Sequence, residues 1–153
     1  MLDVWPPFPL IITYRTTLTD DSNNVLAALE RRDRVDRIHL CQAADTSSAF
    51  EKVFAAMQEP FPELTVLQLE SYNKLAPIVP DSFLGESALR LEFLELDGVL
   101  FPGLPKLLLS ATHLVNLRLL KIPHSGHISA AVMVTALSTL TSLRALDLEF
   151  QSP

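Results

Sequence analysis

The chain has little of what disulfide-stabilised, secreted or membrane-spanning proteins need. Its single cysteine, Cys41, excludes an internal disulfide and is typical of a reducing compartment. No apolar run approaches the roughly 20 residues that a membrane-spanning helix requires. The opening stretch, MLDVWPPFPLII, lacks a basic region and is interrupted by prolines, so it is not a signal peptide. These absences predict a cytoplasmic or nuclear protein without membrane contact.

Basic residues are also few. The chain has 12 Lys and Arg residues against 18 Asp and Glu residues, a formal net charge of -6, which makes nucleic acid a poor partner. Hydrophobic residues make up 48% of the 153 residues, which excludes a mainly disordered chain. This length suits a single domain over residues 1–153 that can bury a sizeable core.

What is present is a repeated leucine pattern. The stretch LRLEFLEL has Leu at 91, 94 and 96, a gap of three and then two, which fits neither a helix face nor a strand face. The same pattern, L-x-x-L-x-L, starts at residues 64, 91, 114 and 143, and VDRIHL at residue 35 is a conservative copy with Val35, Ile38 and Leu40. The five copies are spaced 29, 27, 23 and 29 residues apart. The last two apolar positions of a copy alternate, so they share one face of a short strand. Stacked copies would bury these faces against each other around a parallel sheet.

The pattern also predicts where the elements lie. We expect parallel strands in sequential order near residues 10–14, 36–41, 65–70, 92–97, 115–120 and 144–149. The intervening segments carry helix signals, such as Ser129 at an N-cap position and Pro105 in a first turn. They predict helices near 22–32, 48–58, 104–112 and 129–140, and only one or two helical turns in PDSFLGES. The middle leucines of the later copies should be fully buried, namely Leu67, Leu94, Leu117 and Leu146.

The five copies, over about residues 9–150, resemble the leucine-rich repeat superfamily. The regular family places Asn or Cys three residues after the last leucine of each strand. Those positions here are Ala43, Tyr72, Val99, Ile122 and Gln151. The irregular copies, with the stretches MQEPFPELTVLQL and PDSFLG, look more similar to fungal F-box proteins with such repeats. The resemblance implies an α/β leucine-rich repeat solenoid of five to six repeats, a partial horseshoe with a concave parallel sheet and convex helices.

The resemblance also implies a role. It suggests a protein–protein interaction scaffold, the substrate-recognition part of an F-box-type ubiquitin-ligase receptor, without enzymatic activity and without a cofactor. The alternative is a sensor or regulatory repeat arm of a nucleotide-binding receptor or of a GTPase-activating protein. Because the chain starts almost in a strand and stops just after one, we expect it to be a fragment of a larger protein, in which an F-box or a nucleotide-binding motif would separate these roles.

Three short motifs have a chemical and an ordinary interpretation. His124 and His127 have the spacing of metal ligands, but no Asp, Glu or Cys lies between residues 98 and 146, and zinc needs three or four ligands. His39 and Cys41 could form a nucleophile pair, although nothing nearby in the sequence orients the histidine. GVLFPG, residues 98–103, has glycines spaced as in a phosphate-binding loop but lacks the following lysine. We favour the ordinary interpretations: a polar turn for His124 and His127, an outward-facing pair for His39 and Cys41, and a turn after a strand for GVLFPG.

The run RRDRVDR, residues 31–37, contains four arginines and two aspartates. A nucleic-acid-binding patch would lack the acids and would include aromatic residues. Cations are favourable near the C-terminus of a helix. We therefore expect a solvated helix end.

The remaining candidate site is the concave face, on which the outward positions of all the strands should meet. We expect partner-binding residues here: His39, Gln68, Glu70, Glu95, Asp97, Arg118, Asp147 and Glu149. Five of the outward side chains are acidic, against Arg37 and Arg118, so the face should dock a basic segment of a protein partner. The alternative is that these residues only solvate the sheet. Since Glu95 and Asp97 should lie outside the core, their reversal to Lys should leave the melting temperature nearly unchanged.

Overall fold

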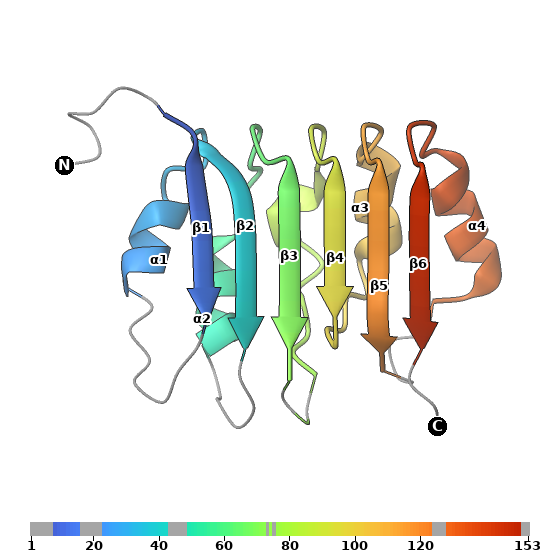
Figure 1. Ribbon diagram of the computed structural model, residues 1–153, viewed down its shortest axis with the longest axis horizontal. Coiled ribbons are helices and arrows are strands. Elements are labelled where there is room, and N and C mark those ends of the chain that lie inside the picture. Colours follow the sequence, from blue (N-terminus) through green and yellow to red (C-terminus); the bar gives the residue numbers. More distant parts are fainter. Residues whose placement is uncertain are drawn as a thin grey trace.

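The computed structural model describes residues 8–15, 23–42, 49–72, 74, 76–123 and 128–150. They form one parallel sheet whose strand order follows the sequence, which confirms an α/β protein. The strands are β1 (Leu10–Arg15), β2 (Val35–Gln42), β3 (Val66–Ser71), β4 (Phe93–Asp97), β5 (Asn116–Ile122) and β6 (Ala145–Phe150). The helical segments are α1 (Asn23–Leu29), α2 (Ala49–Ala56), the 3-10 turn η1 (Phe83–Glu86), α3 (Leu104–Ser110) and α4 (Ala130–Ser138). Figure 1 shows the helices behind the sheet.

The register of the sheet reproduces the leucine spacing of the sequence. The middle positions of the five copies lie directly opposite one another across neighbouring strands, in the order Ile38, Leu67, Leu94, Leu117 and Leu146. The connecting segments differ in length, but each brings the next copy back to the same level. The unequal repeat spacing is therefore absorbed outside the strands.

A ladder of backbone hydrogen bonds fixes this level at the start of each copy. The residue after the first apolar position donates its N–H to the carbonyl of the equivalent residue one copy earlier. The nitrogen–oxygen distance is 2.8 Å for each donor in turn: Thr65, Glu92, Val115 and Arg144. The first apolar residue itself closes a tight turn, as when Leu91 donates to the carbonyl of Ala88 at 3.2 Å. This turn explains the gap of three before the alternating pair.

The core lies between the sheet and the helices. Leu67, Leu94 and Leu117 have no exposed surface, which confirms their predicted burial. The prediction was wrong for Leu146, whose side chain is 44% exposed. Its strand, β6, is the last of the described sheet, so a neighbouring strand covers only one of its sides.

Aromatic side chains fill the space between the helices and the sheet. Phe50 and Phe54 of α2, Phe83 of η1 and Phe101 after β4 form a row with ring centroids 5.3, 5.6 and 5.7 Å apart. The last two pairs meet edge to face, an arrangement that aromatic rings favour. All four rings are buried, so this row links three successive connections of the chain.

The positions where regular repeats carry Asn have no common environment. Val99 is buried, Ile122 is partly buried and Tyr72 is exposed. The other two, Ala43 and Gln151, lie outside the described residues. No polar ladder therefore runs through the described positions, in agreement with their apolar and aromatic character.

The helices are shorter than the sequence predicted. α1 ends at Leu29, so the arginine-rich run lies in the following turn and at the start of β2 rather than at a helix end. Arg34 of this run donates to the carbonyl oxygen of Phe8 at 3.2 Å, which ties the turn to the residues before β1. Ser129 does cap α4, since its side chain accepts a hydrogen bond from the N–H of Val132 at 3.3 Å.

A pair of leucine substitutions tests this packing. Leu94→Ala should lower the free energy of unfolding by about 2–5 kcal/mol, because it leaves a cavity in the centre of the core. Leu146→Ala, the same change at an exposed position of the edge strand, should cost less than about 1 kcal/mol. Urea titration with a common slope for all variants measures both losses. Equal losses would contradict the assignment of Leu94 to the core and Leu146 to the edge.

Candidate functional site

The side of the sheet away from the helices carries the predicted site residues, and we call it the polar face. Parallel register places their side chains in two rows. The first row consists of Thr13, His39, Gln68, Glu95, Arg118 and Asp147. The second row consists of Arg15, Cys41, Glu70, Asp97 and Leu120. Glu149 follows Asp147 at the next outward position of β6.

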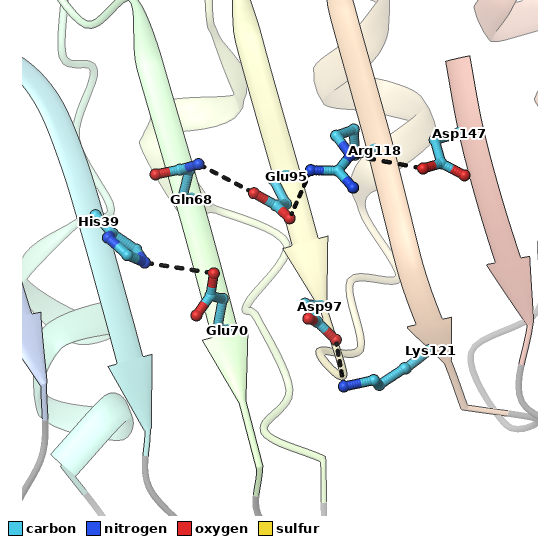
Figure 2. Close-up of polar contacts among 8 residues, drawn as sticks. All are labelled: His39, Gln68, Glu70, Glu95, Asp97, Arg118, Lys121 and Asp147. Atoms are coloured by element: carbon cyan, nitrogen blue, oxygen red, sulfur yellow. Dashed lines mark hydrogen bonds and ion pairs between the residues drawn. The ribbon is translucent and has the colours of Figure 1, made fainter.

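Side chains of the first row form a network across four strands, which Figure 2 shows. The Nε2 of Gln68 donates to Oε2 of Glu95 at 3.0 Å, and Nη1 of Arg118 donates to Oε1 at 3.4 Å. The Nε of Arg118 lies 3.6 Å from Oδ2 of Asp147. The Glu95 side chain is only 8% exposed, whereas those of Arg118 and Asp147 are 43% and 53% exposed. A buried carboxylate thus holds an exposed guanidinium in place.

Two contacts between a basic and an acidic side chain involve the second row (Figure 2). The Nε2 of His39 lies 3.4 Å from Oε1 of Glu70 without a hydrogen bond between them, so this contact is an ion pair only in the protonated form of His39. The Nζ of Lys121 lies 3.7 Å from Oδ1 of Asp97. That distance is too long for a hydrogen bond. Asp97 Oδ1 is therefore a buried oxygen that accepts no hydrogen bond from any described residue.

Burial is the main cause that raises the pKa of the Asp97 carboxyl group above its ordinary value. The positive charge of Lys121 opposes this shift, and the negative charge of Glu70 adds to it. Burial outweighs the nearby cation because the ion pair is long. The charged form of Asp97 is therefore less favoured in the folded chain than in water.

Lys121 was missed by the sequence analysis because a bulge places it on this face. Leu119 pairs with Leu148 and Ile122 with Phe150, so β5 has one more residue than β6 between these pairs. Lys121 adopts a positive φ of 50° and lies over the ring of Tyr72, with Nζ 5.3 Å from the ring centroid. The signal was present in LRLLKI, where an apolar residue at 122 replaces the one that alternation requires at 121.

The charge balance of the polar face differs from the predicted one. Arg15 and Lys121 join the two expected arginines, so the acidic excess is smaller than the sequence suggested. Glu95 and Asp97 lie outside the hydrophobic core, as expected, but both are buried on the polar face, so we now expect their reversal to Lys to lower the melting temperature. Their neighbours on the adjacent strands cover them. The acids of this face that remain exposed are Asp147 and Glu149 of β6.

The structure also describes parts of two of the short motifs, the residue Cys41 and the turn at Gly98. Cys41 is buried beside Arg15 and Glu70, and burial, followed by the negative charge of Glu70, raises the pKa of its thiol. A thiol with a raised pKa is a poor nucleophile. Gly98 forms the turn after β4 with φ of 70°, where a Cβ atom would lie 2.6 Å from the carbonyl oxygen of Ser71.

The predicted histidine pair, His124 and His127, lies outside the described residues. Among the residues whose positions are described, no three His, Cys, Asp or Glu side chains gather to hold a metal ion. No helix within the described ranges is long and apolar enough to cross a membrane.

Comparisons with protein-family models, with curated proteins and with solved structures find no match to this chain.

The raised pKa of Asp97 makes a prediction about pH. A carboxyl group with a higher pKa in the folded than in the unfolded chain stabilises the fold at acid pH, and this contribution is lost as pH rises through the folded-state pKa. Relative to wild type, Asp97→Asn should therefore gain stability as pH rises from about 3.8, the ordinary pKa, toward neutrality. Urea midpoints across this range measure the difference. Leu94→Ala is the control, because its loss should not vary with pH in this way.

The environment of Cys41 predicts low reactivity. In the folded chain at neutral pH, Cys41 should react with a disulfide reagent far more slowly than in urea-unfolded chain, because the thiol is both buried and protonated. The absorbance of the released thiolate follows the reaction. Equal rates in the folded and unfolded chains would show that the thiol is accessible. A faster rate in the folded chain would show that it is also activated, and would reopen the nucleophile interpretation.

Proposed function

We propose that this chain is a protein-binding module of the leucine-rich repeat type, a solenoid that recognises its partner through the polar face. The observation that carries the proposal is the network from Gln68 to Asp147, which orders polar side chains over four neighbouring strands. Ordered side chains lose little further freedom on binding, which favours recognition. The leucine register, the backbone ladder and the helices on one side of the sheet support the repeat assignment.

Arg118 is the central recognition residue in this proposal. Its guanidinium has five N–H donors in a fixed fork, and its two contacts leave others for a carbonyl or carboxylate of the partner. Arginine and tyrosine are frequent among the residues that dominate binding energy at protein interfaces. Exposed Tyr72, held beside Lys121, is the second such residue on this face.

The exposed acids define the chemistry of the partner. Asp147 and Glu149 lie on β6, next to Arg118, and attract cations by their charge. The partner therefore places a basic segment at β6 and a hydrogen-bond acceptor over Arg118. Charges at such a surface act mainly on the association rate and on specificity.

The cellular role that we propose rests on the resemblance to fungal F-box proteins. In that role the chain is the substrate-recognition part of a ubiquitin-ligase receptor in the cytoplasm or nucleus, and it has no catalytic activity of its own. A sensor or regulatory arm would use the same face for another partner. The proteins recovered with the chain distinguish these roles, since the first requires a ubiquitinated substrate.

The test begins with a pull-down that uses the wild-type chain and an Arg118→Met variant as baits. A specific partner should be recovered with the wild type and lost with the variant. With that partner, Asp147→Lys should slow association by a factor of about 3–10 at low salt, because it removes an attraction at the binding surface. Glu51→Lys, the same charge change on the exposed surface of α2, is the matched control and should leave the rate nearly unchanged.

Salt provides a second readout. Association with the wild type should slow as ionic strength rises, because charges are screened over about 8 Å at physiological salt. The Asp147→Lys variant should show less of this dependence. Unchanged recovery with Arg118→Met, together with rates that ignore Asp147→Lys, would mean that the polar face only solvates the sheet.

A further inference from the structure

The two edge strands of the described sheet differ in how their side chains are covered. At β6, the inward side chains of Leu146, Leu148 and Phe150 are exposed. An apolar cavity of about 340 Å³ opens beside them, between the sheet and α4, and Leu119 and Met133 contribute to its lining. At β1, the inward side chain of Ile12 is buried and packs with α1. The sheet thus has one apolar end and one covered end.

We propose that copies of this chain associate head to tail, with β6 of one copy pairing in parallel with β1 of a second copy. Both strands contain six residues, run in the same direction within their sheet and have a neighbouring strand on one side only in the described structure. Edge strands with unpaired backbone groups readily pair with another chain. Head-to-tail pairing would continue the sheet with the same parallel pairing that joins its neighbouring strands.

The rows of the polar face favour this arrangement. Thr13 belongs to the row that ends at Asp147, and Arg15 lies one outward position further along β1. Continuing the register past β6 places Thr13 of the second copy beside Asp147 and Arg15 of the second copy beside Glu149. Opposite charges on adjacent strands attract. The side chains of Arg15 and Glu149 are both exposed in the single chain, so each can face the other across such a strand pair.

The inward positions match as well. The same register places Ile12 of the second copy beside Leu146, and Tyr14 of the second copy beside Leu148. Contact with the covered end of the second copy would remove the exposed leucines from water. Burial of apolar surface is the main favourable contribution to association.

Charge disfavours the symmetric alternative, in which two β6 strands pair. A two-fold axis perpendicular to the sheet makes the strands antiparallel, with residues of the same face opposite one another. Registers that pair most of β6 then place Asp147 opposite Glu149 of the other copy, or place one of these two acids opposite its own equivalent. Like charges directly opposite destabilise a strand pair. Symmetric pairing of two β1 strands leaves the apolar end at β6 uncovered.

Sedimentation velocity of the purified full chain tests the proposal. The head-to-tail contact does not close, so the mean mass of wild type should rise continuously with concentration. Arg15→Glu and Glu149→Arg should each weaken self-association by about tenfold or more, and the double variant should restore it. The matched controls are Arg37→Glu of β2 and Glu51→Arg of α2, which make the same charge changes on exposed side chains outside the proposed strand pair.

Leu148→Lys tests the apolar part of the contact. Leu148 is already partly exposed, so the variant should keep the circular dichroism spectrum of wild type but remain a monomer. A monomeric wild type at every concentration, a dimer of fixed mass, or a double variant that associates no better than the single ones would overturn the proposal. The variant Arg118→Met, which tests the proposed function, changes a residue of β5 outside the proposed strand pair and should still self-associate.

Discussion

The common register of the five leucine copies is the constraint on which the rest of the structure depends. It places equivalent residues opposite one another although the copies are 29, 27, 23 and 29 residues apart. The leucines then form the core, and the residues between them form the polar face. A slip of one residue would exchange the two sets, with carboxylates against the aromatic row and leucines in water. The backbone ladder before the strands opposes such a slip at every copy.

The sequence predicted the strands, their order and the inward leucines because these follow from local spacing. The sequence could not predict which strand lies at an edge of the described sheet. Leu146 has the same position in its copy as Leu94, but it is exposed because β6 is an edge strand. Alternation tells on which face of the sheet Glu95 lies, but its burial depends on Gln68 and Arg118 from other strands. The position of Lys121 depends on an inserted residue that breaks the alternation.

The polar face combines a satisfied and an unsatisfied buried carboxylate. Glu95 accepts hydrogen bonds on both oxygens, whereas one oxygen of Asp97 accepts none from the described residues. Buried polar networks are more costly than apolar packing unless every group is satisfied. Apolar side chains at these two positions would give a more stable fold. This arrangement supports the proposal that the face is used for recognition, since its cost brings no gain to the fold itself.

Each strand of the sheet makes its main strand contacts with the strands directly beside it. In such a one-dimensional arrangement, stability is the sum of local terms and of terms between neighbours. These contributions are unequal here, because within the described sheet β6 has a neighbouring strand on one side only and its inward residues are the most exposed. Thermal opening therefore starts at β6 and moves toward the aromatic row, so backbone amides of β6 exchange with solvent before those of β3 and β4.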